Sequence, residues 1–245
     1  MNRSLLTLAV LVALLAGLGV WWFARNNPYR HALRVRELAT WGLADCVAKT
    51  HPGQRVLVLS NPFTQRAGTA KEILQAEAAG LRGLKRGFGT RLSLAAVEFP
   101  ELKPGALTNP RGLFIDRETT TPLSYLVASD AFDKAVNQHP DCGLVVSLIG
   151  LPVELERVQC WQRPGTPCFA LLLPDLRLIG DAAAVQGAVS SGKLVAFVLA
   201  RPGAPTSASA PGRDAAAEFE RRFVLVTGEN FEQVRRTYPG LFPRR

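Results

Sequence analysis

Histidine is scarce in this sequence, with three residues in a chain of 245. His51 and His139 precede the first and third expected strands, and His31 lies close to an amino-terminal apolar segment. Sites in parallel sheets form at the carboxyl ends of the strands, so His51 and His139 are expected at the wrong edge. The chain also lacks the Gly-x-Ser-x-Gly, Gly-x-x-x-x-Gly-Lys-Ser/Thr and His-Glu-x-x-His motifs. We therefore expect no histidine-based catalysis.

Cysteine is scarce as well, since four residues are too few for a fold built on disulfides. No Cys-x-x-Cys pair or Cys/His ligand spacing occurs, so no metal site and no cofactor are expected. Two disulfides, Cys160–Cys168 and Cys46–Cys142, are geometrically compatible with an oxidising compartment. The alternative is four buried, inert thiols.

Acidic residues are outnumbered, with 20 Asp and Glu against 29 Lys and Arg, for a net charge of +9. The densest basic stretch, Arg82 to Arg86 followed by Arg91, closes a helix, and with only Phe88 between these residues it lacks the interleaved aromatic residues that would stack on bases. We therefore expect no nucleic-acid partner. The apolar fraction of 47% and charged fraction of 20% suit a globular protein and exclude a disordered chain.

An uncharged apolar segment runs from Leu5 to Phe23. As a helix it would span roughly 28 Å, close to the thickness of bilayer hydrocarbon. Trp21 and Trp22 near its end suit the headgroup boundary. The segment predicts a transmembrane anchor over residues 1–24 with the lipid bilayer as its partner. A cleaved signal peptide and a buried helix are the alternatives.

The orientation of the expected anchor rests on two opposing arguments. A short amino terminus before an apolar helix favours export, so an extracytoplasmic (periplasmic) domain is expected. The arginines that follow the segment outnumber Arg3 before it, which favours the cytoplasm. A juxtamembrane helix is expected over residues 25–50.

The remaining residues alternate between short Val/Leu-rich runs and helical patterns. Strands are expected at residues 55–60, 92–99, 143–149, 169–173, 194–199 and 223–227, with a further short one at 112–115. This pattern predicts an α/β fold with one open, doubly wound, mostly parallel sheet of about six strands, Rossmann-like or flavodoxin-like. The domain is expected over residues 51–245, with a mobile loop at 203–213.

Residues that follow the strands are the candidate ligand-binding groups, because ligands of open α/β sheets bind outside the carboxyl ends of the strands. Ordinary turn chemistry is the alternative explanation for each of them. By position the candidates are Ser60, Asn61, Thr64, Glu98, Gly150, Asp175, Glu229 and Asn230.

Three stretches, Gly143 to Pro152, Gly165 to Pro174 and Ser191 to Pro202, resemble the strand succession of type I periplasmic solute-binding proteins of sugar-type ABC transporters. The resemblance covers roughly residues 55–202 and concerns one lobe, because the family's two lobes need a longer chain. It implies that Ser60, Asn61 and the segment from Ser147 to Gly150 face a ligand.

Three functions remain open at this point. The first is a membrane-tethered, non-catalytic module that binds a small molecule and is accessory to a transport or sensing complex. The second is a structural or interaction domain with a membrane protein partner. The third is an enzyme that uses a metal or carboxylates, for which Glu98, Asp175 and Glu229 would have to cluster.

Overall fold

The computed structural model describes residues 27–109, 112–165 and 167–243. The predicted anchor between Leu5 and Phe23 lies outside these residues. Within them, no helix is both long and apolar enough to cross a membrane. The α-helices are α2 (Pro28–Thr50), α3 (Lys71–Phe88), α4 (Leu123–Leu126), α5 (Ala131–Gln138), α6 (Gln159–Gln162), α7 (Ala182–Ser190), α8 (Ala215–Arg222) and α9 (Phe231–Thr237). Short 3-10 helices are η1 (Pro62–Gln65), η3 (Leu155–Arg157), η4 (Leu176–Leu178) and η5 (Pro239–Leu241).

One six-stranded sheet forms the centre of the molecule. Its strands are β1 (Arg55–Leu59), β2 (Ser93–Glu98), β3 (Leu144–Ser147), β4 (Cys168–Leu172), β5 (Leu194–Ala200) and β6 (Phe223–Thr227). They lie in the order β2-β1-β3-β4-β5-β6. The strands from β2 to β5 pair in parallel. The expected mostly parallel, doubly wound sheet is therefore confirmed, with the flavodoxin-like order.

The last strand departs from the expectation that all six strands point the same way. β6 pairs with β5 antiparallel, with Ala196 opposite Thr227 and Ala200 opposite Phe223. The chain after β5 passes through α8 without crossing to the other end of the sheet. β6 therefore starts beside the last residue of β5 and runs back along it. The short strand expected at residues 112–115 does not form. All four of these residues are described, and none of them is in a strand.

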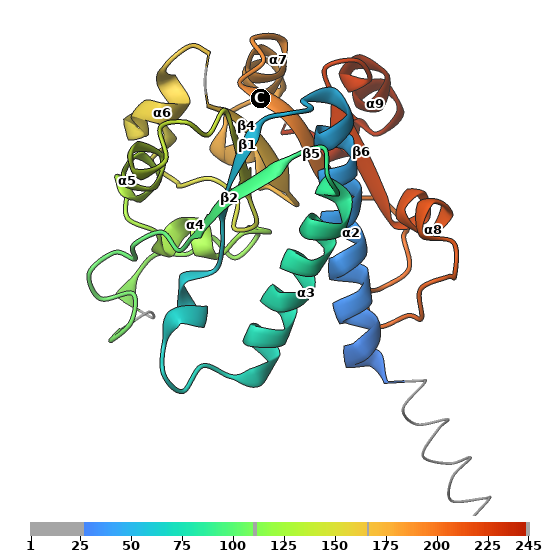
Figure 1. The fold of residues 1–245 in the computed structure, drawn as a ribbon, viewed down its shortest axis with the longest axis horizontal. Helices are drawn as coiled ribbons and strands as arrows, with labels where there is room; N and C mark the ends of the chain where they lie inside the picture. The colour runs from blue at the N-terminus through green and yellow to red at the C-terminus, as the bar shows by residue number, and fades with distance from the viewer. Residues whose placement is uncertain (1–26, 110–111, 166, 244–245) are drawn as a thin grey trace, which may run out of the picture.

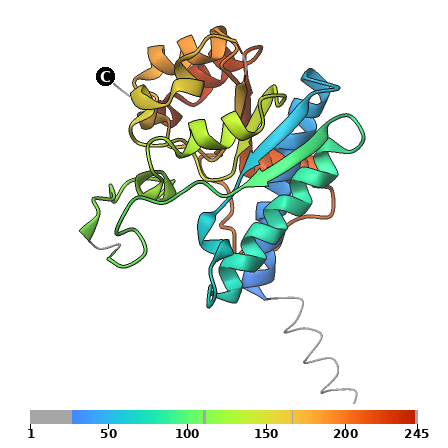
Figure 2. The same cartoon turned by 60° about the vertical axis from the view of Figure 1, so that its left-hand side comes forward.

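Helices cover both faces of the sheet (Figures 1 and 2). The face covered by α2, α3 and α8 carries one core cluster, which includes Leu43, Val58 and Phe219. The opposite face carries a second cluster beneath α5, α6, α7 and α9, which includes Phe132 and Phe169. Strand residues alternate between the two clusters because successive side chains point to opposite faces.

α2 is part of the α/β unit and covers its sheet, although residues 25–50 were expected to form a separate juxtamembrane helix. Asn27 caps its start by accepting hydrogen bonds from the Tyr29 and Arg30 amides, and Pro28 follows at the first helical position. Leu43 and Val47 are fully buried against the strands. The folded unit therefore begins before residue 51.

α2 and α3 pack closely through small residues. An added Cβ at Gly83 would lie 2.0 Å from Thr40 Oγ1 and 2.2 Å from the Glu37 carbonyl oxygen. At Gly87 it would lie 2.5 Å from Ala44 Cβ. Ile73 and Leu74 of α3 are 39% and 41% exposed. The face of α3 that carries Gly80, Gly83 and Gly87, which we call the glycine face, is buried, because it lets the two helix backbones approach.

Candidate functional site

A cleft of about 290 Å³ lies at the carboxyl ends of β1, β3 and β4. The strand order reverses between β1 and β3, which is where doubly wound sheets open a crevice for ligands. We call this cavity the switch-point cleft. Its lining residues come from α2, α3, the turn after β1, the segment before α4 and the ends of β3 and β4: Arg36, Asn61, Ile73, Ala76, Glu77, Thr120, Thr121, Pro122, Leu123, Leu148, Ile149, Leu172 and Leu173.

A partly buried ion pair joins the two helices beside this cleft. Arg36 Nη2 lies 2.8 Å from Glu77 Oε2, and Arg36 Nε donates to the Ala76 carbonyl at 2.9 Å. The Glu77 side chain is 6% exposed, whereas that of Arg36 is 28% exposed. Both residues line the cavity, and Arg36 is the more exposed of the two.

The turn after β1 is held by the same carboxylate. Ser60 Oγ donates to Glu77 Oε1 at 2.5 Å, and the Asn61 amide donates to that oxygen at 3.3 Å. Asn61 also caps η1 by accepting from the Phe63 amide, and Thr64 Oγ1 donates to the Asn61 carbonyl. Of these three predicted residues, Asn61 lines the cleft, Ser60 is buried behind it, and Thr64 stabilises the turn.

The turn after β3 is compact. Ser147 Oγ donates to the Gly150 carbonyl at 2.6 Å. Gly150 has a φ of +80°, and an added Cβ there would lie 2.8 Å from Ser124 Oγ and from Thr121 Cγ2. Both predicted residues therefore shape the wall formed by Thr121 and Ile149, and neither is itself among the residues that line the cleft.

A second cavity of about 400 Å³, which we call the Arg177 cleft, adjoins the first and shares Thr120 and Leu173 with it. Predicted Asp175 is buried here and forms two hydrogen bonds with Arg177, at 2.9 and 2.7 Å. Burial raises the pKa of Asp175, but hydrogen bonds from Arg177 and Thr119 lower it more, so it lies below its ordinary value.

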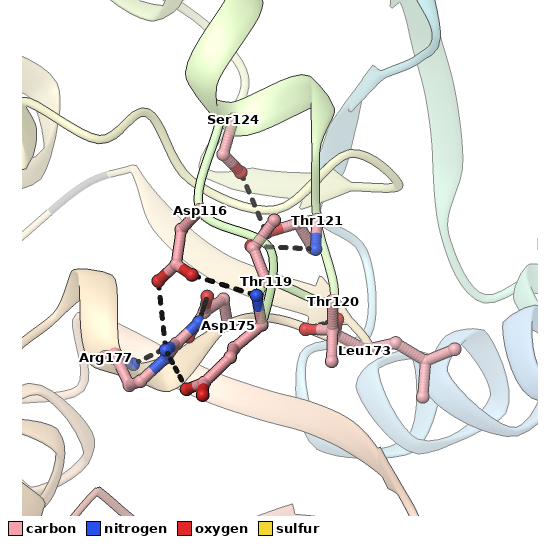
Figure 3. A network of polar contacts seen from close by, with 9 residues as sticks. Asp116, Thr119, Thr120, Thr121, Ser124, Leu173, Asp175 and Arg177 are labelled. Atoms are coloured by element: carbon pink, nitrogen blue, oxygen red, sulfur yellow. Dashed lines mark hydrogen bonds and ion pairs between the residues drawn. The ribbon is translucent and has the colours of Figure 1, made fainter. Parts of the chain in front are cut away.

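Arg177 also pairs with Asp116 at 3.0 Å and Glu118 at 3.4 Å (Figure 3). These contacts fasten the segment before α4 to the end of β4. Thr120 Oγ1 donates to the carbonyl of Leu173, which has an unusual φ of +46° for a residue with a side chain. Such backbone conformations persist only where the surroundings fix them.

A third cavity of about 480 Å³ lies between the first half of α2 and residues 200–207. We call it the α2 groove. It shares Arg36, Ala76, Leu172 and Leu173 with the switch-point cleft. Its far wall is fixed by buried Arg222, which donates to the carbonyls of Pro205, Thr206 and Ser209. The mobility that we expect of residues 203–213 stays a prediction, although the loop carries these contacts.

Glu98 lies outside the switch-point cleft and pairs with a histidine. His139 Nε2 is 2.9 Å from Glu98 Oε1, and both side chains are partly exposed. The expectation that His139 is remote from every candidate residue is therefore wrong. The edge position of β2 brings its last residue against the end of α5.

β6 runs antiparallel to the other strands. Its carboxyl end, followed by Glu229 and Asn230, therefore lies beside the amino-terminal ends of the parallel strands, away from the switch-point cleft. Asn230 accepts from the Thr227 amide and donates to the Leu225 carbonyl, so its side chain stabilises its own turn. Glu98, Asp175 and Glu229 do not cluster. β2 and β4 are separated by two strands, or about 14 Å, and Glu229 is at the far edge. Within the described ranges, no group of three or more metal-ligating side chains occurs.

All four cysteines are free thiols. Cys142 and Cys160 belong to the core beneath α5 and α6, whereas Cys46 and Cys168 pack against the core beneath α2. The two expected disulfides, Cys46–Cys142 and Cys160–Cys168, are therefore not formed, because the sheet separates the members of each pair. Burial raises the pKa of Cys160 to about 12, which keeps this thiol protonated and unreactive.

Sequence reasoning missed Arg36, Glu77, Thr120 and Thr121. Arg36 and Glu77 sit on helices whose register against each other follows from the glycine face of α3, and that face was not predicted. One signal was present: Glu77 occupies a position among small residues of α3, where a lone charge needs a partner. Thr120 and Thr121 fall in an irregular segment with no periodic pattern.

No protein-family model matches the chain, and no curated protein matches its sequence. Among solved structures, the chain is similar to a glucose-galactose binding protein from Geobacillus stearothermophilus, at 9% identity and a TM-score of 0.44, over 80% of this chain and 61% of that one. It is also similar to an arabinose binding protein from the same organism (12%, TM-score 0.43, 81% and 62%). A third is the sugar-binding protein of a sugar ABC transporter from Bacillus halodurans (13%, TM-score 0.43, 81% and 64%).

The chain spans about three fifths of the length of these proteins. The resemblance expected from the strand succession is therefore found, as a distant likeness to part of sugar-type solute-binding proteins.

Proposed function

We propose that this protein is a membrane-tethered, non-catalytic module that binds a small molecule at the carboxyl edge of its sheet. Its anchor would be the segment from Leu5 to Phe23, its folded unit would be extracytoplasmic, and its role would be accessory to a transport or sensing complex. The observation that carries the proposal is the switch-point cleft, where two helices and three strand ends surround one cavity.

The lining of the cleft suits a ligand with both polar and apolar surface. Arg36, Asn61 and Thr120 offer a guanidinium, an amide and a hydroxyl, while Ile73 and Leu172 offer apolar contact. This mixture is usual in small-molecule sites, where a few polar groups orient a ligand that apolar walls enclose. The volume of about 290 Å³ suits a molecule of monosaccharide size.

Thermal unfolding of the full chain in lipid nanodiscs tests this proposal. The probes are L-arabinose, D-glucose, myo-inositol, sodium acetate and sodium octanoate, each titrated separately. A probe present at a hundredfold excess over its Kd should raise the Tm by about 5 to 10 °C. Ala76→Trp should abolish the shift because Ala76 lines the cleft, and its fold is checked by circular dichroism.

Ala78→Trp is the matched control, because Ala78 is exposed on the same helix and lies outside the cleft. It should keep the full shift. If no probe raises the Tm of the wild-type chain, or if the shift survives in Ala76→Trp, the cleft is not a binding site for this range of molecules.

A further inference from the structure

We propose that the ligand is an anionic amphiphile of the fatty-acid type. Its carboxylate would bind Arg36, and its hydrocarbon chain would lie in the α2 groove. This inference rests on the proposed function, because it names the class of ligand that enters from the same cleft.

The charge of the head group follows from the Arg36–Glu77 pair. Both oxygens of Glu77 are engaged, Oε2 by Arg36 and Oε1 by Ser60 and the Asn61 amide. Arg36 uses Nε and Nη2, and within the described part of the chain Nη1 has no hydrogen-bond partner. Arg36 Nη1 is therefore a hydrogen-bond donor that is still available on a partly exposed cation, and such a donor suits a carboxylate.

The chain of the ligand follows from the walls of the α2 groove. Its apolar lining includes Ala32, Leu33 and Val35 of α2, Leu172 and Ala200 at the ends of β4 and β5, and Phe223 at the start of β6. Two further arginines border the groove, but protein oxygens occupy them. Arg201 donates to the Glu220 carbonyl and the Tyr238 hydroxyl, and Arg222 is paired with Glu218.

Arg36 stands where the two cavities meet. It lines both, together with Ala76, Leu172 and Leu173, so one molecule can contact Arg36 and extend into the groove. A small, fully hydroxylated ligand would leave these apolar walls unfilled. The groove also includes Tyr29, six positions after Phe23. The proposed anchor would therefore hold this end of the groove close to a bilayer, from which amphiphiles could enter it.

The experiment is isothermal titration calorimetry on the full chain in lipid nanodiscs, with the heat from empty nanodiscs subtracted. The probes are acetate, hexanoate, octanoate and 1-octanol. Affinity for the carboxylates should rise about fourfold per added methylene. In Ala32→Trp, which fills the groove, this chain-length dependence should disappear. Ala78→Trp should bind all four probes as the wild-type chain does.

Arg36→Gln tests the head group separately, and should lower octanoate affinity at least tenfold while leaving 1-octanol unchanged. Because Arg36→Gln leaves the buried Glu77 carboxylate without its cationic partner, Arg36→Gln/Glu77→Gln is measured beside it and should show the same loss of octanoate affinity. Chain-length dependence that persists in Ala32→Trp would overturn the inference. So would L-arabinose or D-glucose binding in the cleft without octanoate binding, a result that leaves the proposed function intact. Failure of every probe would overturn both.

Discussion

Glu77 connects two helices and the turn after β1 through one carboxylate, since it accepts from Arg36, Ser60 and the Asn61 amide. A buried carboxylate with three donors stabilises a defined geometry, because losing any donor would leave charge uncompensated in a low-dielectric site. The position of Asn61 at the cleft is a consequence of this arrangement.

The sequence predicted Ser60 and Asn61 but not Glu77 and Arg36, for a physical reason. A residue that follows a buried strand is placed by the direction of that strand, which short-range patterns reveal. The contact of Arg36 with Glu77 depends on how α2 and α3 lie against each other, over a separation of 41 residues. No local pattern contains that information.

The glycine face of α3 gives a prediction at the scale of one residue. Gly83→Ala should lower the free energy of unfolding by about 1–3 kcal/mol, because its Cβ would clash with Thr40 and the Glu37 carbonyl. Chemical denaturation measures the change. Gly187→Ala in α7 is the control: nothing lies within 4 Å of the added carbon, so stability should rise by about 0.5–1 kcal/mol. Equal effects in the two helices would contradict the close packing.

Among the elements, strand positions were predicted closely and strand direction less well. Val/Leu runs bounded by turn residues locate buried strands, and each expected strand apart from residues 112–115 is present. The direction of β6 depends on the segment after β5. A segment that crosses to the other end of the sheet gives a parallel strand, and one that stays at the end where β5 stops gives an antiparallel strand. α8 is eight residues long and follows a long loop, so the chain returns without crossing.

The loop before α8 gives a prediction at the scale of an element. Burial raises the pKa of Glu218, but hydrogen bonds from Arg221, Arg222 and the Gly212 backbone lower it more, to about 2 from an ordinary 4.5. The folded state therefore gains stability from this carboxylate above about pH 4.5, and loses it as the pH falls toward 2. Urea unfolding at pH 7 and pH 3 should show a smaller acid loss in Glu218→Gln than in the wild-type chain.

At pH 7, Glu218→Gln should cost about 3–5 kcal/mol, since it leaves the buried Arg222 without its anionic partner. Glu232→Gln is the matched control, because its ion pair with Arg235 is exposed and should contribute at most about 1 kcal/mol. Similar costs for the two variants would show that the loop is not held by the Glu218–Arg222 pair.

For the whole molecule, the membrane anchor is a prediction from sequence that can be tested directly. The wild-type chain should stay in the membrane pellet after carbonate extraction. Leu11→Arg/Leu15→Arg should move to the soluble fraction, because each charge costs about 2.5–3.5 kcal/mol at the centre of a bilayer. Ala78→Arg, on the exposed face of α3, should leave the distribution unchanged. A wild-type chain that is found in the soluble fraction, with a mass that shows loss of its amino-terminal segment, would instead indicate a cleaved signal peptide.

α2 is both the first described helix of the folded unit and a wall of two cavities, so the proposed anchor would limit how far those cavities lie from a bilayer. Four residues separate Phe23 from Pro28, so the chain between them spans at most about 17 Å. With the proposed anchor in a bilayer, a connection this short would keep both cavities next to the membrane surface, within reach of molecules that partition into it.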